Sequence, residues 1–322
     1  MKKQISALFV GLGSIGSRHI KNLAAACSER GISLCCHALR YDLTKDLRDG
    51  VAELLAAQFI SLESEEALPH YDLAFITNPT SLHAETLELL KGRADALFIE
   101  KPIFCAEQTA LKLSDLLAEG QKAYVAAPMR WSAVMLALEA WLKENPTQRP
   151  YCARVICSSY LPDWRPGVDY RTVYSAHRDM GGGVTIDLIH EWDYLVHLFG
   201  MPKRVYNLKG TYSDLEIDSD DLSVYIAEYP AMLAEVHLDY FGRGYRRQIE
   251  LLTRDGSVIA DFGAATLTLP DGSVQSFGEK TDRWYHREMA YFLTYALTGE
   301  GESINSPAEA LSVLKLTLGE QQ

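Results

Sequence analysis

Asp187, His190 and Asp193 follow the glycine run Gly181–Gly183 at intervals of three residues. Imidazole has a reference pKa of about 6.5, so a histidine can accept and return a proton near neutral pH. A carboxylate one helical turn away can orient the ring and stabilise its charged form. For one histidine alone, a buried core position would be the better interpretation. The two flanking carboxylates and the glycine run favour acid–base chemistry, with His190 and Asp187 as candidate catalytic residues.

Lys101 stands between Glu100 and Pro102, directly after the apolar residues 96–99. An unbroken apolar run is typical of a buried parallel strand, and open α/β sheets bind their ligands at the carboxyl ends of such strands. A lysine there can polarise a carbonyl or hold a hydroxyl oxygen. Lys101 is therefore the third candidate catalytic residue, and a surface ion pair with Glu100 is the alternative.

The segment 160–183 has no clear periodicity and is rich in Tyr, Trp and Arg. The planar guanidinium of arginine suits a carboxylate or phosphate, and the segment leads directly into the glycine run. We therefore expect it to bind an anionic group of the substrate, with Arg171 as the test position. Three aspartates in the same segment leave ordinary loop ion pairs as the alternative. The candidate substrate-binding residues are Trp164, Arg165, Tyr170, Arg171, Tyr174, Asp187 and His190.

The element that positions such chemistry lies near the amino end of the sequence. Residues 7–10 form an apolar run, and Gly11-Leu12-Gly13-Ser14-Ile15-Gly16 follows as G-x-G-x-x-G. A helix is predicted over 17–30, and strand, glycine turn and helix together are the context of a dinucleotide fingerprint. Gly11 permits the tight turn, Gly13 lets backbone approach the pyrophosphate, and Gly16 lets helix pack on strand. The N–H groups at the helix start, around Ser14 and Ile15, then face the phosphates.

The end of the second predicted strand, 32–39, bears on the choice of cofactor. In a dinucleotide-binding fold this strand end meets the adenosine ribose, where Asp or Glu suits a free 2′-hydroxyl and Arg suits a 2′-phosphate. Arg40 occupies this position and Asp42 follows two residues later. We expect NADP or NAD as the cofactor, with NADP weakly preferred. A solvated loop charge is the alternative interpretation of Arg40.

Strand and helix patterns alternate through the first part of the chain, which predicts an α/β fold with a doubly wound parallel sheet in residues 1–125. Residues 126–322 predict an α+β domain with an open, mostly antiparallel sheet, because several strands follow one another between 205 and 269. From Met232 the apolar residues alternate, which favours one sheet face covered by helices. Helices are expected, among others, at 17–30, 51–57, 107–119, 184–199, 284–297 and 307–318.

Composition excludes several classes of protein. A chain of 322 residues with net charge −12 is poorly suited to nucleic acid or an acidic membrane surface. No stretch approaches the roughly 18 apolar residues of a membrane span, and no secretory signal is recognised. The six cysteines form no C-x-x-C pair, so we expect reduced thiols in the cytoplasm and no metal site.

The motifs together resemble the glucose–fructose oxidoreductase / inositol dehydrogenase (Gfo/Idh/MocA) family. The resemblance rests on Gly11–Gly16 with Arg18-His19, on Thr77-Asn78-Pro79 with His83, on Glu100-Lys101-Pro102 and on 181–193. It implies a Rossmann domain, a second domain with an open sheet, and NAD(P)-dependent hydride transfer on sugars or sugar derivatives. It also implies a homodimer or homotetramer through the C-terminal sheet.

By this resemblance Lys101 anchors the substrate and His190 exchanges its proton. The role of Asp187 is in doubt, because many members have the aspartate four residues before the histidine and here it lies three before. The residues at the cofactor are then Gly11, Gly13, Ser14, Ile15, Gly16, Arg40, Thr77, Asn78, Pro79, His83, Glu100 and Lys101. A cofactor-retaining epimerase or glycosidase-like enzyme and a non-catalytic dinucleotide-binding regulator are the alternatives to a dehydrogenase.

Overall fold

The computed structural model describes residues 2–298 and 303–320. The chain forms two compact units, one of Met1–Pro128 with Tyr285–Leu311 and one of Met129–Trp284 with Ser312–Gln322. The sequence prediction ended the first domain at residue 125 and gave everything after it to the second. In the structure, a carboxyl-terminal stretch of the chain belongs to the first unit.

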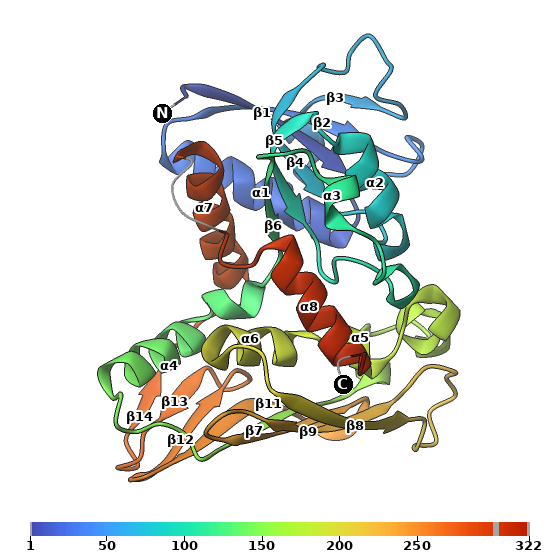
Figure 1. Cartoon of the computed structure of the whole chain (residues 1–322). Helices are drawn as coiled ribbons and strands as arrows, with labels where there is room; N and C mark the ends of the chain where they lie inside the picture. Colours follow the sequence, from blue (N-terminus) through green and yellow to red (C-terminus); the bar gives the residue numbers. More distant parts are fainter. Residues whose placement is uncertain (1, 299–302, 321–322) are drawn as a thin grey trace. The chain divides into compact units, whose positions relative to one another are not determined.

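The first unit contains a six-stranded parallel sheet (Figure 1). The strand order is β3-β2-β1-β4-β5-β6, so the order reverses between β1 and β4. This is the topological switch point at which doubly wound sheets bind ligands. The strands are β1 (Gln4–Val10), β2 (Ser33–Leu39), β3 (Leu55–Phe59), β4 (Tyr71–Ile76), β5 (Ala94–Ile99) and β6 (Lys122–Val125).

Helices cover both faces of this sheet, which is why its strands are apolar without alternation. Figure 1 shows α1 (Ser14–Glu29) and α7 (Asp282–Thr298) on one face, and α2 (His83–Leu90) and α3 (Leu113–Leu116) on the other. Phe75 and Phe98 of the sheet meet Phe292 of α7 at ring-centroid distances of 5.6 and 5.2 Å. These contacts explain why the late helix α7 belongs to the first unit: it completes this core.

Two predicted helices of the first unit are wrong. Residues 51–57 form a 3₁₀ turn, Ala52–Leu54, followed by β3, because pairing with the edge of β2 outweighs the helix propensity of alanine and leucine. The helix expected over 107–119 is reduced to the 3₁₀ turn Ala106–Gln108 and the single turn of α3. The Thr109 hydroxyl bonds to the Ala106 carbonyl, a local bond that competes with a continuous helix.

The second unit contains an eight-stranded sheet in the order β14-β13-β12-β11-β7-β10-β9-β8. Only β10 and β7 pair in parallel among these neighbours, so the prediction of a mostly antiparallel sheet is confirmed. The strands are β7 (Cys152–Tyr160), β8 (Arg204–Gly210), β9 (Leu222–Glu228), β10 (Leu233–Asp239), β11 (Phe241–Thr253), β12 (Gly256–Asp261), β13 (Thr266–Thr268) and β14 (Val274–Ser276).

One face of this sheet carries the helices α4 (Ala133–Glu144), α5 (Val184–Asp187) and α6 (His190–Phe199) (Figure 1). The end of α8 (Pro307–Leu318) joins them, since the Tyr225 hydroxyl donates to the Thr317 carbonyl at 2.7 Å. The alternation predicted from Met232 holds through most of β10, where Val236 is buried and Leu233 is exposed.

The single helix expected over 184–199 is two helices, α5 and α6, with Leu188 and Ile189 between them. The backbone of Leu188 leaves the helical region (φ −98°, ψ 30°), so the residues before and after it do not share one helical face. The segment 160–183 is ordered as four 3₁₀ turns: Leu161–Asp163, Tyr170–Thr172, Tyr174–Ala176 and Arg178–Met180. None of the described helices is both long and apolar enough to span a membrane.

Candidate active site

The glycine turn after β1 is closely packed at two of its three glycines. Gly11 has a φ of +88°, and a Cβ there would lie 2.9 Å from backbone atoms of Asn78. A Cβ on Gly16 would lie 2.7 Å from the hydroxyl of Thr77, which itself donates to the Gly11 carbonyl at 2.5 Å. A Cβ on Gly13 would meet nothing within 4 Å. The turn is therefore packed against Thr77 and Asn78, which follow β4, and it is open at Gly13, where α1 begins with Ser14 and Ile15.

The turn after β4, which contains Pro79, is held by a buried histidine. The ring nitrogens of His83 lie 3.1 Å from the Asn78 carbonyl and 3.2 Å from the Ile103 carbonyl. Burial lowers the pKa of His83, against the opposite effect of the two carbonyls. Since a neutral imidazole has a single N–H, it donates to one of these two carbonyls, and the ring lies between the turn after β4 and the chain that follows β5. The Asn78 side chain donates to Thr86 at 2.8 Å, while its Oδ1 is buried and accepts no hydrogen bond from the described residues.

Glu100 and Lys101 follow β5 at the same edge of the sheet. One carboxylate oxygen of Glu100 bonds to His19 Nε2 on α1, and the other accepts the Lys101 N–H at 3.2 Å. Burial pushes the pKa of Glu100 up, but the hydrogen bond and charge of His19 and the charge of Lys101 outweigh it and the pKa is lowered. The ionised carboxylate therefore fixes the backbone that carries Lys101.

These residues fit a nicotinamide dinucleotide. The start of the sixteen-residue helix α1, the open space at Gly13 and the unpaired Asn78 Oδ1 all lie beside the switch point between β1 and β4. At the end of β2, Arg40 donates to Gln58 at 2.7 Å and to the Lys45 carbonyl at 2.5 Å.

In the second unit, Asp187 is held by two tyrosines. The Tyr174 hydroxyl donates to Oδ1 of Asp187 at 2.8 Å and the Tyr240 hydroxyl donates to Oδ2 at 2.6 Å. Burial, reinforced by the Asp187 charge, raises the pKa of both tyrosines, so both remain protonated donors. Asp187 ends α5 and His190 begins α6, and both line one pocket.

This pocket, which we call the His190 pocket, has a volume of about 430 Å³. Of the predicted residues it brings together Trp164, Asp187 and His190. The Trp164 indole donates to Ser159 at 3.0 Å and meets the Tyr240 ring edge-on at 5.2 Å. Its lining consists of Cys157, Ser159, Tyr160, Asp163, Trp164, Asp187, Leu188, His190, Gly242, Arg243, Tyr245 and Arg247.

Four predicted substrate-binding residues do not line this pocket. Arg171 pairs with Asp169 at 2.9 Å and with Glu216 at 2.6 Å, and the Tyr170 hydroxyl accepts the Glu216 N–H at 3.2 Å. Arg165 lies over the Tyr174 ring at 5.6 Å, and Tyr174 reaches the site through Asp187. The charge of Arg171 is therefore compensated by two carboxylates, Asp169 within the segment and Glu216 outside it.

Residues 5–127 match the Gfo/Idh/MocA family model, described as an oxidoreductase family with an NAD-binding Rossmann fold. Residues 5–127 therefore carry the NAD-binding Rossmann domain of this family, and they lie within the first unit. The chain is an NAD-dependent oxidoreductase.

The similar proteins agree with this assignment. The uncharacterized oxidoreductase YrbE of Bacillus subtilis (strain 168) is 22% identical over 272 residues, 81% of this chain and 75% of that protein. The apo form of levoglucosan dehydrogenase has a TM-score of 0.81 at 15% identity, over 99% of this chain and 97% of that chain. The WlbA dehydrogenase of Bordetella pertussis, solved with NADH and UDP-GlcNAcA, has a TM-score of 0.76 at 19% identity, over 98% and 94%. Both structures share the fold across nearly the whole chain.

The three-residue spacing suggested that Asp193 orients His190, but the structure gives the Asp193 carboxylate another partner. Asp193 is buried and accepts two hydrogen bonds from Arg130, at 2.7 and 2.9 Å. Arg130 also contacts His197 at 3.1 Å, and His197 contacts Glu139 at 2.7 Å. Asp193 therefore anchors α6 to the chain before α4.

Sequence reasoning also missed the wall of the pocket that β11 supplies. Arg243, Tyr245 and Arg247 line the pocket beside His190, more than fifty residues later in the chain. Arg247 forms two hydrogen bonds with the buried Glu191, at 2.7 and 2.9 Å. The sequence carries one signal of this wall, since Gly242 and Gly244 flank an arginine inside a strand pattern, and an isolated glycine there indicates a bulge.

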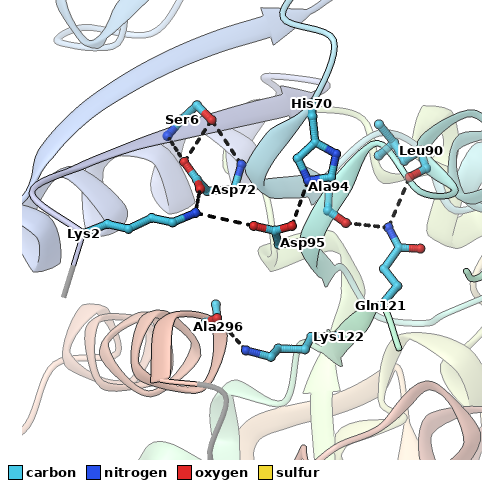
Figure 2. Close-up of polar contacts among 10 residues, drawn as sticks. All are labelled: Lys2, Ser6, His70, Asp72, Leu90, Ala94, Asp95, Gln121, Lys122 and Ala296. Carbon is cyan, nitrogen blue, oxygen red and sulfur yellow. Dashed lines mark hydrogen bonds and ion pairs between the residues drawn. The ribbon is translucent and has the colours of Figure 1, made fainter. Parts of the chain in front are cut away.

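A second pocket, of about 480 Å³, lies at the amino ends of the strands of the first unit, and we call it the amino-edge pocket. Figure 2 shows four of its side chains, Lys2, Asp72, Asp95 and His70, connected by ion pairs. Lys2 bonds to Asp72 and lies 3.6 Å from Asp95, which His70 contacts at 2.8 Å. Lys122 donates to the Ala296 carbonyl of α7 at 2.7 Å. This pocket lies at the edge of the sheet opposite the glycine turn.

Proposed function

We propose that this oxidoreductase transfers a hydride between a nicotinamide cofactor and the CH–OH carbon of a sugar or sugar derivative. The observation that carries the proposal is the His190 pocket, in which an imidazole and a carboxylate stand beside an aromatic wall. Its size is within the usual range for small-molecule sites, and aromatic faces with a few polar groups suit a sugar ring. Arg243, which lines this pocket, favours an anionic sugar derivative, such as a sugar acid or a nucleotide sugar.

In the proposed reaction, the C–H bond of the carbinol carbon breaks as the carbonyl forms. A nicotinamide dinucleotide held by the glycine turn Gly11–Gly16 would supply the hydride acceptor for this oxidation and the hydride donor for the reverse direction. Lys101 holds the reacting oxygen through its ammonium group, and His190 takes the hydroxyl proton as general base. Asp187, fixed by Tyr174 and Tyr240, positions this part of the pocket and favours a charged imidazole after proton transfer.

We also propose a weak preference for NADP(H), because Arg40 stands at the end of β2. Its guanidinium bonds to Gln58 and to a backbone carbonyl, so its positive charge is held at the strand end. Calorimetry on Arg40→Ala should show weaker NADP(H) binding and nearly unchanged NAD(H) binding. Tighter binding of NAD(H) by the wild type, or equal loss for both cofactors, contradicts the preference.

The exposed face of the second sheet supports assembly into a homodimer or homotetramer. Tyr206 and Leu208 of β8 and Ile226 of β9 lie there with their side chains exposed. Contiguous apolar patches of this kind mark interaction surfaces. Light scattering should give a multiple of the chain mass, and Leu208→Asp with Ile226→Asp should shift the protein towards the monomer.

The cysteines support a reducing compartment, which we propose is the cytoplasm. All six are free, and burial raises the pKa of the Cys36 and Cys157 thiols. Protonated, buried thiols behave as small apolar side chains. Mass spectrometry of protein prepared without reductant should find six unmodified thiols, and a disulfide would contradict the proposal.

The proposed activity is tested by a substrate screen. Sugars, polyols, sugar acids and nucleotide sugars are each incubated with NAD⁺ and NADP⁺, and the absorbance of the reduced nicotinamide is followed. We expect turnover with at least one sugar derivative and none with matched deoxy compounds that lack the reacting hydroxyl. Product formation without net cofactor reduction would instead indicate a cofactor-retaining epimerase or glycosidase-like enzyme. Cofactor binding without any product would indicate a regulator.

A further inference from the structure

The wall of the His190 pocket that β11 supplies is a bulge pinned against β7. Phe241 pairs with Tyr160 and Arg246 pairs with Ser158, so residues 242–245 leave the ladder between these two pairs. A Cβ on Gly242 would overlap the Ser158 hydroxyl, and the Gly242 N–H donates to Asp239 at 2.7 Å. Bulges aim side chains in directions that a regular strand does not allow. Here the bulge brings Arg243 and Tyr245 to the pocket.

Arg243 is held by an aromatic ring. Its guanidinium carbon lies 3.7 Å from the centroid of the Tyr160 ring, a cation–π contact that holds the group against the ring. A stacked guanidinium keeps its N–H donors at its edge, where they match the two oxygens of a carboxylate. Arg243 forms no ion pair with any residue that the structure describes.

The other arginine of the pocket is neutralised. Arg247 is held by the two oxygens of Glu191, whose side chain is fully buried. Arg171, the position expected to bind an anion, pairs with Asp169 and Glu216 and does not line the pocket. Among the arginines considered for an anion, Arg243 therefore combines a place beside His190 with an uncompensated charge.

The acidic side chains of the pocket suit the remaining parts of such a ligand. Asp163 lines the pocket and forms no ion pair with any described residue, so its carboxylate is available to accept sugar hydroxyls. Asp187 already accepts hydrogen bonds from two tyrosines. The pocket thus offers one guanidinium for an anionic group and carboxylates for hydroxyls, which is the pattern of a polyhydroxylated acid.

We propose that Arg243 binds the carboxylate of a sugar acid, either free or attached to a nucleotide, while His190 acts on one of its hydroxyls. This inference rests on the proposed dehydrogenase function, because that function places the substrate in the His190 pocket. Arg243 then selects uronic acids and related acids over the corresponding neutral sugars.

The test measures binding rather than turnover. Protein saturated with NADH is titrated with glucuronate and glucuronamide, and separately with UDP-glucuronate and UDP-glucose, and affinities are determined by calorimetry. The variants are Arg243→Gln and Arg243→Lys, with Arg254→Gln as the matched control because Arg254 is exposed and outside the pocket. Arg171→Gln is the competing position.

We expect the wild type to bind at least one acid about tenfold or more tightly than its neutral partner. Arg243→Gln should abolish this preference, Arg243→Lys should retain part of it, and Arg254→Gln and Arg171→Gln should keep it. Equal binding of acids and neutral partners by the wild type overturns the proposal. The same holds if Arg243→Gln retains the preference, if only Arg171→Gln loses it, or if Arg243→Gln weakens UDP-glucose as much as UDP-glucuronate.

Failure of the dehydrogenase proposal is distinguishable from failure of this one. If no compound is turned over but acids are still preferred through Arg243, only the proposed reaction is contradicted. If neutral sugars are turned over and acids are not preferred, only the proposed role of Arg243 is contradicted. Circular dichroism and NADH affinity, which should be the same for all variants, exclude misfolding as the cause of a lost preference.

Discussion

The amino-edge pocket and the His190 pocket have similar volumes, about 480 and 430 Å³, but they differ in how their charged side chains are paired. In the first, Lys2, Asp72, Asp95 and His70 form one chain of ion pairs (Figure 2). In the second, Arg243 and Asp163 form no ion pair with any described residue. A pocket whose charges compensate one another has little left to offer a ligand. The uncompensated Arg243 and Asp163 beside His190, and not the volume of the pocket, therefore support the choice of the His190 pocket as the site.

The largest difference between the pockets should appear when a histidine is removed from each. His190→Ala should lower kcat/KM by about 10²–10⁴, because a general acid–base residue contributes that much to proton transfer. His70→Ala, the matched change in the amino-edge pocket, should leave kcat/KM within about twofold of wild type. Steady-state kinetics on a substrate from the screen checks both. Similar losses in the two variants would remove the distinction between the pockets.

The helix that carries His190 depends on a buried ion pair, whereas the amino-edge pairs are exposed. Arg130→Met leaves the buried carboxylate of Asp193 without its partner, and such a change costs about 3–5 kcal/mol of folding free energy. Urea unfolding of the variant should show this loss. The double variant Arg130→Met with Asp193→Leu should recover part of it, since no charge is then buried alone. A loss below about 1 kcal/mol in the single variant would mean that α6 is held by other contacts.

Acidic side chains at the two ends of β5 extend the comparison between buried and exposed ion pairs. Glu100, after its carboxyl end, is buried and has a lowered pKa, so it binds its proton less readily when folded than when unfolded. Its stabilising contribution is therefore present above the unfolded pKa of about 4.3 and is lost as pH falls through the folded pKa. The stability difference between wild type and Glu100→Gln should be greatest above about pH 5 and should shrink below pH 4. A difference that does not change with pH would assign the effect to packing alone.

Asp95, at the amino end of the same strand, should give the smallest effect. Its pairs with Lys2 and His70 are about half exposed, and exposed pairs contribute about 0–1 kcal/mol. Asp95→Asn should therefore change the unfolding free energy by less than about 1 kcal/mol, and high salt should reduce the difference further. Unfolding at low and high ionic strength checks this. A larger effect that salt does not reduce would show that the amino-edge pocket contributes to the fold more than its exposure suggests.

Much of the first unit follows from local sequence. The apolar run 7–10 and the glycines after it predict a strand and a turn because the whole pattern lies within ten residues. The structure confirms both, and the close packing at Gly11 and Gly16 involves Asn78 and Thr77, more than sixty residues later in the chain. The helix expected over 51–57 was wrong because its residues gain more by pairing with β2, a contact that helix propensity does not register.

The sequence by itself predicted the NAD-binding domain, the parallel sheet and the mostly antiparallel second sheet, and it proposed His190 and Lys101 as candidate residues. Tertiary structure alone decided which neighbours His190 has. Leu188 interrupts the expected helix, and the Asp193 carboxylate accepts hydrogen bonds from Arg130. Asp187 is held by Tyr174 and by Tyr240, which lies fifty-three residues away. The pairing of the arginines was also decided by tertiary structure. Arg171 pairs with the nearby Asp169, whereas a bulge on β11 brings Arg243 to the pocket. Charge compensation depends on distances between residues far apart in the chain, and a linear pattern does not contain those distances.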